Sequence, residues 1–328
     1  IRYKQICLVG SEMCIRDRVG MASMRATGDT RLPSMLMILA AVLNVILDPI
    51  LIFGVGPIPA MGLNGAAMAA LLARASIFIG TLYLMRYRLD MVSFNKPDPG
   101  ELRQSWRDIL HVGIPAAGTN IVVPVGAALV TAMIARFGPD AVAGFGVASR
   151  IESMMLVMYY ALSAIIGPFV GQNFSAGKEE RIVRALWLCT AFCIGSGLVI
   201  AGLLASMSGW LPGLFSDSES VRQVTTMFLL IVPVSYGTYG MVMIMNASFN
   251  GLGYPLPGVV ISVCRIAVLY IPVALIAMQF FDIAGIFAAY AIANVVSGLG
   301  AYVWARRTVR SRCAEEAILR KAAAEARP

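Results

Sequence analysis

The chain has 328 residues, of which 59% are apolar and only 13% are charged, and its formal net charge is +8. Soluble domains carry roughly 25% charged residues, so this composition leaves too little polar surface for a water-facing globule and excludes a soluble enzyme. The basic residues lie between and beyond long apolar runs, which indicates a membrane protein rather than a nucleic-acid-binding one.

The first 18 residues do not follow the pattern of the rest. Ser11–Arg18 reads S-E-M-C-I-R-D-R and resembles the translation of a sequencing adapter. Residues 1–18 also lack a helical period and a cleavage-site pattern, which argues against a signal peptide. We therefore expect residues 1–18 to be non-native, and native sequence to begin near Val19 inside a gene whose start is missing.

Long charge-poor runs follow, and most are long enough to cross about 30 Å of hydrocarbon as a helix. The sequence therefore predicts an all-α, polytopic membrane helix bundle. A helix remnant is expected at Val19–Thr27. Eight full spans are expected at Pro33–Phe53, Leu63–Met85, Ile109–Phe137, Ala141–Phe174, Glu180–Ser208, Ser220–Asn250, Pro255–Gln279 and Ile283–Arg307.

The connecting segments differ in their content of Lys and Arg. Basic residues gather near 25–31, 86–107 and 178–184 and after Arg306, whereas the alternate loops hold few. Basic loops stay on the cytoplasmic side of a membrane. We therefore expect a multi-pass protein of the inner (plasma) membrane with its polar linker and C-terminal tail in the cytoplasm.

The sequence also contains a weak internal repeat, because residues 19–88 and 239–307 follow the same plan. A helix end and a Gly-containing turn precede a span with a mid-helix proline, and a glycine then opens a helix of small residues. The matching positions are Pro49 and Pro272, then Gly65 and Gly285. Many transporters build a central site from repeated halves.

Three motifs in order resemble one family. Arg25–Pro33 (R-A-T-G-D-T-R-L-P), followed by Leu43–Gly54 (L-N-V-I-L-D-P-I-L-I-F-G), is similar to the fourth-to-fifth helix region of multidrug and toxic compound extrusion (MATE) transporters. Val170–Lys178 (V-G-Q-N-F-S-A-G-K) resembles the turn after helix eight of that family, and Asn250–Gly253 resembles the turn after helix ten. The resemblance covers Val19–Arg307.

The resemblance implies twelve helices in two pseudo-symmetric six-helix lobes, of which this chain holds eight full helices and lacks the first three and most of the fourth. Residues 19–85 would be the rest of the N-terminal lobe, meaning the end of helix four with helices five and six. Residues 86–108 would join the lobes, 109–307 would be the C-terminal lobe, and 308–328 the cytoplasmic tail. We expect a monomer in the lipid bilayer, and we expect this chain alone not to transport.

Asp48 is the main candidate for chemistry, because a carboxylate in mid-span costs at least about 2.5 kcal/mol and should face the interior of a bundle or water. Asn44 lies one turn earlier on the same face. Pro49 has no N–H and leaves the Val45 carbonyl without its usual helical partner. These oxygen atoms suit Na⁺. Asp48 could instead carry a proton, or be a structural residue bonded to neighbouring helices.

The resemblance is nearer to the DNA-damage-inducible branch of the family, in which matching Asn and Asp residues form the cation site of the first lobe. It therefore places that role on Asn44 and Asp48. Two departures stand against it: the partner Asp of the first helix lies outside this chain, and Ala66–Ala70 occupy the stretch where the branch has a Thr. The other large branch uses carboxylates in helices seven and ten, and both are absent here.

Other charged residues lie within the predicted spans. Arg150 and Glu152 could form a gate or a proton relay, or a structural pair with neighbouring charges. Arg74 and Arg265 could extend to the membrane surface or pair with a carboxylate. The sequence leaves these alternatives open.

Polarisable side chains on the predicted spans suit varied aromatic cations, although each could serve helix packing alone. The candidate substrate cavity comprises Asn120, Met158, Tyr159, Tyr236 and Tyr239. Prolines within spans can bend helices in a way that serves alternating access. The candidates for this role are Pro49, Pro115 and Pro124.

The sequence thus predicts a secondary active transporter that exports organic cations or drugs in antiport with H⁺ or Na⁺ by alternating access of two lobes. The alternative is a related flippase for lipid-linked oligosaccharides. The chain contains one His and no HExxH, GxSxG or P-loop motif, so neither an enzyme nor an ATP-driven pump is expected. No cofactor and no bound metal are expected.

Overall fold

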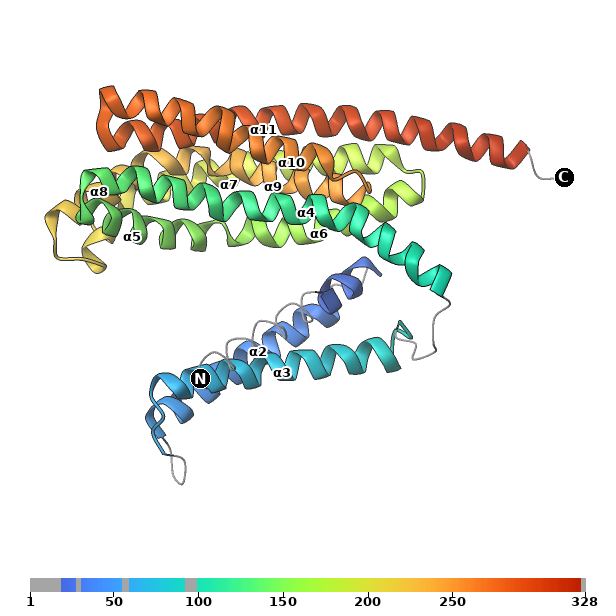
Figure 1. Ribbon diagram of the computed structural model, residues 1–328, viewed down its shortest axis with the longest axis horizontal. Helices are drawn as coiled ribbons and strands as arrows, with labels where there is room; N and C mark the ends of the chain where they lie inside the picture. The colour runs from blue at the N-terminus through green and yellow to red at the C-terminus, as the bar shows by residue number, and fades with distance from the viewer. Residues whose placement is uncertain (1–18, 28–30, 55–58, 92–98, 326–328) are drawn as a thin grey trace. The chain divides into compact units, whose positions relative to one another are not determined.

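The computed structural model describes residues 19–27, 31–54, 59–91 and 99–325, except for the side chains of 99, 112, 115, 116, 119, 120, 122, 123 and 317–325. Within these residues the regular structure is helical and there is no β-strand, which confirms the all-α fold. The chain divides into two compact units, Ile1–Pro99 and Gly100–Pro328. Figure 1 shows the helices of both units.

Unit 1 is built from three helical segments. Residues 19–26 are helical, and α2 (Arg31–Pro49) continues as the π-helical segment η1 (Ile50–Gly54). The chain returns as α3 (Leu63–Tyr87), which packs along α2. Most large apolar side chains of α2 are exposed, as expected for a helix whose solvent is lipid.

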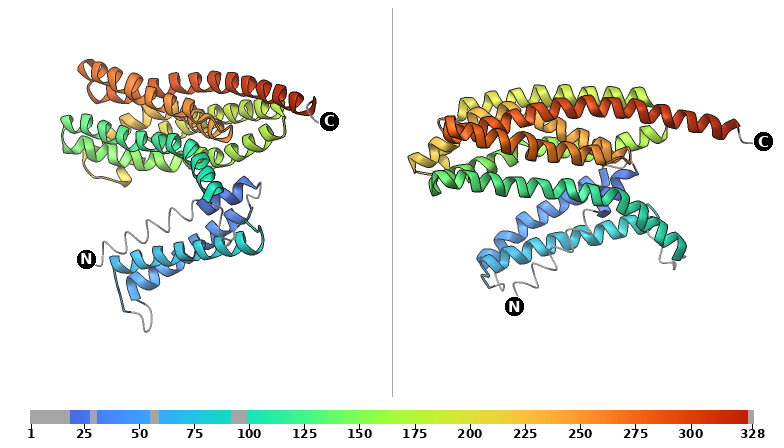
Figure 2. Two further views of the ribbon diagram at one scale, coloured as in Figure 1. Left: turned by 45° about the vertical axis from the view of Figure 1, so that its right-hand side comes forward. Right: turned by 45° about the horizontal axis from the view of Figure 1, so that its top comes forward.

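Unit 2 is a bundle of long helices (Figure 2). Its first half contains α4 (Pro99–Ile134), α5 (Pro139–Met155), α6 (Val157–Ser175) and α7 (Glu179–Met207). Its second half contains α8 (Glu219–Ile231), η4 (Val232–Ser235), α9 (Tyr236–Gly251), α10 (Leu256–Val263), η5 (Cys264–Tyr270) and α11 (Ile271–Glu325).

Helix α9 forms the centre of unit 2, because most of its residues are buried and it packs against α6, α7 and α11. Glycines allow this approach. A Cβ atom on Gly197 of α7 would lie 2.5 Å from the Gly237 nitrogen, and one on Gly251 would collide with the Gly167 carbonyl of α6. Small residues at helix contacts are the usual way for membrane helices to pack closely.

The two turns that carry family motifs, after α6 and after α9, end their helices with the same backbone geometry. After α6, Gly177 has φ of 69° and the Lys178 N–H donates to the Asn173 carbonyl at 2.9 Å. After α9, Gly253 also has φ of 69° and the Tyr254 N–H donates to the Phe249 carbonyl at 3.0 Å. Glycine in this left-handed conformation ends a helix and satisfies its last carbonyls.

The structure shows two further similarities between the halves of the repeat. A π-helical segment lies beside each mid-helix proline: η1 follows Pro49, and η5 precedes Pro272. In each half the helix-opening glycine also lies against the end of the preceding helix, since a Cβ on Gly65 would collide with the Leu51 carbonyl and one on Gly285 with the Ala277 carbonyl.

The predicted helix bounds need three corrections. Helix α4 begins at Pro99 rather than Ile109 and stays helical through Pro115 and Pro124. The single helix predicted at Ala141–Phe174 is α5 and α6, bent by 45° near Leu156. Ser149 and Ser153 donate to carbonyls one turn earlier, at 2.7 and 2.8 Å, and such bonds often bend helices.

The third correction concerns the last two spans, which are joined through Asp282 with φ of 49° rather than by a loop, and of which the second continues as a helix to Glu325 instead of ending at Arg307. By length and composition, five described helices could cross a membrane, or six if α5 and α6 form one span. One of the five is the 61-residue stretch Leu256–Glu316, which contains the Asp282 turn and is long enough for two crossings. The number of spans and the domain bounds stay predictions.

We expect Gly197→Ala to lower the free energy of unfolding by about 1–3 kcal/mol, because the added methyl group forces the α7 and α9 backbones apart. Gly195→Ala is the matched control on the same helix, since a Cβ there meets nothing within 4 Å. Thermal unfolding in detergent micelles compares the two variants. Equal melting temperatures for both would contradict the packing account.

Candidate functional site

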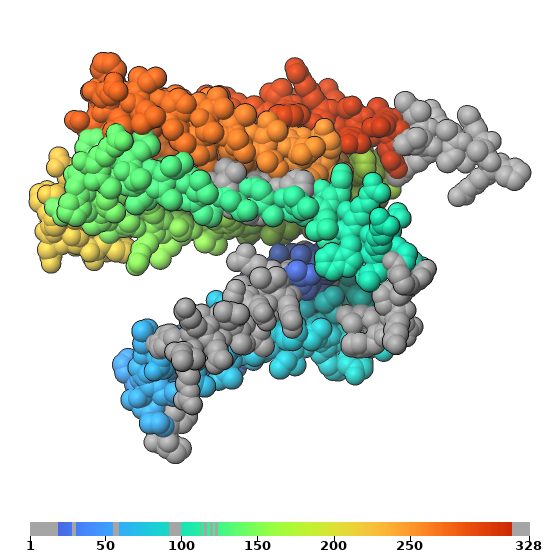
Figure 3. All heavy atoms as spheres, viewed as in Figure 1, coloured from blue at the N-terminus to red at the C-terminus, as the bar shows by residue number. Residues whose placement is uncertain are grey.

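A cavity of about 430 Å³ lies within unit 2, lined by residues of α4, α5, α6, α8, α9, η5 and α11. Side chains of α4 and η5 meet at its edge, where Ile266 packs on Gly126. In the space-filling view the green residues of α4 and α5 lie directly against the orange residues of η5 and α11 (Figure 3). The polar residues that line the cavity are Thr131, Ser149, Glu152, Ser153, Tyr160, Tyr239, Arg265, Tyr270 and Tyr290.

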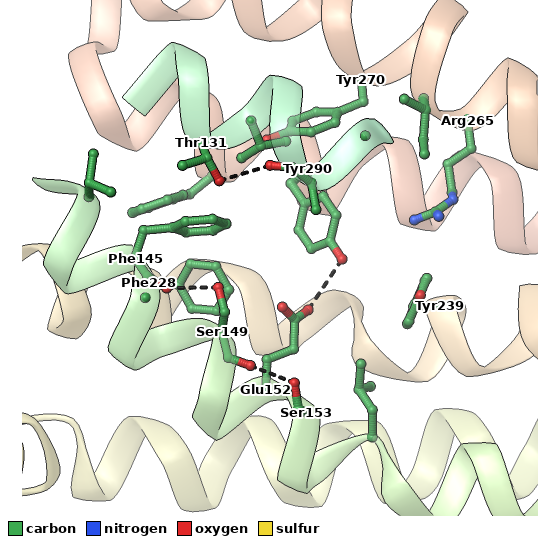
Figure 4. Close-up of a pocket in the computed structure, with 18 of the residues that line it drawn as sticks. Thr131, Phe145, Ser149, Glu152, Ser153, Phe228, Tyr239, Arg265, Tyr270 and Tyr290 are labelled. Carbon is green, nitrogen blue, oxygen red and sulfur yellow. Dashed lines mark hydrogen bonds between the residues drawn. The ribbon is translucent and has the colours of Figure 1, made fainter. Parts of the chain in front are cut away.

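One wall of the cavity is aromatic (Figure 4). The Phe228 ring lies edge-on to the rings of Phe145 and Phe287, with centroids 6.0 and 5.1 Å apart. Tyr270 and Tyr290 form a second edge-to-face pair at 5.3 Å. Rings held in these geometries stabilise one another, so the wall presents fixed aromatic surfaces to a ligand.

Glu152 lies in the last turn of α5, just before the bend at Leu156. The Tyr290 hydroxyl of α11 donates to its Oε1 at 3.2 Å. Leu156 at the bend also lines the cavity, and the Tyr290 bond holds the Glu152 carboxylate to α11. Arg150, its neighbour two positions earlier, is exposed, because residues i and i+2 of a helix do not share a face.

Arg265 is the buried cation of the cavity and lies in the π-helical segment η5, with 5% of the residue exposed. One of its terminal nitrogens donates to Asn294 Oδ1 at 2.9 Å, and the Asn294 amide donates to Ser235 Oγ at 3.1 Å. The guanidinium also lies over the Tyr239 ring, 4.8 Å from its centroid. The Arg265 Nε has no hydrogen-bond partner.

Glu152 and Arg265 line the same cavity, yet in the described part of the chain they form no direct ion pair. Each is instead held by a neutral partner, Tyr290 for the carboxylate and Asn294 for the guanidinium. Charges in a low-dielectric interior are costly unless they are bonded. A cavity that holds two separate, partly bonded charges can still offer hydrogen-bonding capacity to a ligand.

The candidate coupling residues lie in unit 1. Asn44 Nδ2 donates to Asp48 Oδ1 at 3.5 Å along α2, and both side chains are half-buried. The predicted common face of these two residues is therefore confirmed. Pro49 ends α2, and the π-helical segment η1 begins at the next residue.

Of the predicted cavity residues, Tyr239 lines the cavity and three others lie in helix packing. Tyr159 is fully buried, and its hydroxyl lies 3.3 Å from the Cys193 carbonyl and 3.2 Å from Ser196 Oγ of α7. Tyr236 is buried without a partner for its hydroxyl, and Met158 packs on the core. The side chains of Asn120 and Pro115 lie outside the described residues, and Pro124 is exposed.

The sequence did not predict a substrate-binding role for Arg265, for its partner Asn294, or for most of the aromatic residues that line the cavity. Arg265 carried a signal, since an ionisable residue inside an apolar span is a candidate for function. Tyr290, Asn294 and the three phenylalanines carried none, because aromatic and amide residues are common in membrane helices.

A sequence profile of the MatE family matches residues 115–276. The chain is 35% identical to the FAD transporter of Shewanella oneidensis, over 93% of this chain and 68% of that protein. It is 26% identical to the probable multidrug resistance protein YoeA of Bacillus subtilis, over 87% of this chain and 64% of that protein. The chain therefore spans about two thirds of the length of these relatives.

Solved structures agree with the fold. The Vibrio cholerae MATE transporter VcmN in its bent form is 28% identical and superposes with a TM-score of 0.78, over 93% of this chain and 67% of that one. An outward-facing multidrug resistance MATE transporter is 22% identical with a TM-score of 0.86, over 95% of this chain and 70% of that one. The second likeness supports the fold alone.

We expect Asn294→Leu to lower the free energy of unfolding by about 3 kcal/mol, because it leaves the buried Arg265 charge without its acceptor. Thermal unfolding in micelles measures the loss. The double variant Arg265→Met with Asn294→Leu should regain most of it, since an apolar pair of similar size leaves no unpaired charge. A double variant no more stable than Asn294→Leu would contradict this role of Asn294.

Proposed function

Because the chain belongs to the multidrug and toxic compound extrusion (MatE) family, we propose that it is a secondary active transporter that exports small organic compounds in exchange for H⁺ or Na⁺. Members of this family are multi-pass membrane transporters and not enzymes. The named relatives carry FAD or drugs, which supports export over the flipping of lipid-linked oligosaccharides. Organic cations or drugs are the substrate class that the sequence predicts.

The Asn44–Asp48 pair carries the proposal of ion coupling. Asp48 is a half-buried carboxylate on a helix that is mainly apolar and most of whose large apolar side chains are exposed. A carboxylate in such a span is costly and is commonly part of an ion or proton pathway. H⁺ and Na⁺ can each neutralise it, so one residue can link the ion gradient to the conformation of the protein.

The distribution of basic residues supports the proposed orientation. Basic residues gather around the end of α3 and the start of α4, within residues 86–107, and in the tail from Arg306, which favours the cytoplasmic side of the inner membrane. With the linker and tail there, export moves a compound from the cytoplasm to the outside.

We expect Asp48→Asn to reduce ion-driven transport about tenfold or more, because an amide cannot bind H⁺ or Na⁺ as a carboxylate does. The measurement is efflux from cells that express the gene extended to the full length of the relatives that this chain matches, with Na⁺ and pH gradients imposed separately. Ethidium and flavin mononucleotide serve as substrates in separate runs. The gradient that drives efflux identifies the coupling ion.

Asp90→Asn is the matched control in unit 1, since Asp90 is an exposed carboxylate that pairs with Arg86 at 3.3 Å. It should transport as the unmodified protein does, with equal amounts of protein in the membrane. Unchanged efflux in Asp48→Asn under both gradients would make Asp48 a structural residue and contradict the proposal.

A further inference from the structure

The permanent charge of the unit-2 cavity is positive. Among its described lining residues, the acidic and basic side chains are Glu152 and Arg265, and residues 112–123 of α4 contain no ionisable residue. Arginine keeps its proton in proteins, whereas a carboxylate becomes neutral by taking one. The cavity therefore carries a net charge of zero or +1 from these two groups. Arg265 therefore opposes an organic cation in this cavity, and only Glu152 and the aromatic rings favour one.

Arg265 has hydrogen-bonding capacity to spare. A guanidinium offers five N–H donors, and the structure assigns one nitrogen of Arg265 to Asn294 and leaves Nε without a partner. The Asn294 bond and the Tyr239 ring fix the direction of the group. Figure 4 shows the guanidinium on the side of the cavity shared by Tyr290 and Tyr239. A planar donor fork of this kind suits phosphate or carboxylate.

The rest of the lining suits a flat ring system. Phe145, Phe228 and Phe287 form one cluster of rings that line the cavity, and Tyr270 and Tyr290 form an edge-to-face pair that also lines it. A cavity of about 430 Å³ lies within the range of small-molecule sites. Rings can stack on these side chains while a charged group reaches Arg265.

We propose that this cavity binds an aromatic substrate with an anionic arm, and that Arg265 binds the phosphate or carboxylate of that arm. The inference rests on the proposed transport function and replaces the organic cation of the sequence prediction for this cavity. Glu152 opposes the anion by its own charge, so the two residues have opposite effects on affinity. A flavin mononucleotide has this chemistry, and the Shewanella oneidensis relative is named as a FAD transporter.

The first test compares three ligands on the purified chain in detergent, by titration of intrinsic ligand fluorescence. Flavin mononucleotide and riboflavin share one ring system and differ by the phosphate, and ethidium is an aromatic cation. We expect flavin mononucleotide to bind about ten- to a hundredfold more tightly than riboflavin, as expected for a hydrogen-bonded charge pair. Ethidium should bind no more tightly than riboflavin.

Variants of Arg265 and Glu152 then test whether these two residues cause the preference for the phosphate. Arg265→Gln should abolish the preference for the phosphate, and Arg265→Lys should keep part of it. Glu152→Gln should tighten the binding of flavin mononucleotide, which a merely structural role would not do. Arg222→Gln is the control, because Arg222 is a half-exposed arginine of α8 that pairs with Glu219 outside the cavity.

Equal affinities for flavin mononucleotide and riboflavin, tighter binding of ethidium, or no binding of flavin mononucleotide to the folded chain would each overturn the proposal. The ligand comparison on the unmodified chain stands even if a variant fails to fold. Binding needs no ion gradient, so the titration tests the site by itself, and the efflux measurement with Asp48→Asn tests the transport function separately.

Discussion

The absence of water in the hydrocarbon core is the constraint on which the rest of this structure depends. Backbone N–H and C=O groups there must find partners within the protein, so spanning segments are helical. Lipid tails are as apolar as leucine, and helices associate through close packing instead. Helix α9 shows the result, since glycines bring its backbone against those of α6 and α7. At the ends of α6 and α9, turns through the left-handed glycines Gly177 and Gly253 give the last carbonyls of each helix hydrogen-bond partners.

The same constraint explains why most buried polar groups are bonded to one another or to backbone carbonyls. In unit 2, Arg265, Asn294 and Ser235 form a chain of hydrogen bonds between η5, α11 and η4, beside the Glu152–Tyr290 bond. In unit 1 the polar pair is Asn44–Asp48. The two units therefore carry different chemistry: a carboxylate that can take a cation in unit 1, and a cavity with a permanent positive charge in unit 2.

The sequence predicted the helices and the Asn44–Asp48 face, because hydropathy and the helical period are local properties. It could not predict the bend near Leu156, which follows from serine bonds in α5, or the π-helical segments beside Pro49 and Pro272. The start of α4 was wrong because the polar residues before Ile109 favoured a linker, although they continue the helix from Pro99.

The cavity was largely beyond sequence analysis, because its walls come from segments far apart in the chain. Tyr159, Tyr236 and Tyr239 were chosen by residue type, and only Tyr239 lines the cavity. A helix that is buried all round, such as α9, has no polar face to show which side chains meet a cavity. The sequence shows Arg265 as a charge in an apolar span. It does not show that Asn294 is its partner, because Asn294 lies on another helix, 29 positions later in the chain.

We propose above all that the unit-2 cavity is the substrate site and that the Arg265 guanidinium selects the substrate. The most direct measurement is a structure of the protein in lipid nanodiscs with flavin mononucleotide bound. The account predicts the phosphate within hydrogen-bonding distance of the Arg265 guanidinium and the ring system against Phe145, Phe228 and Phe287. A ligand bound outside this cavity, or within it with its phosphate away from Arg265, would contradict the account.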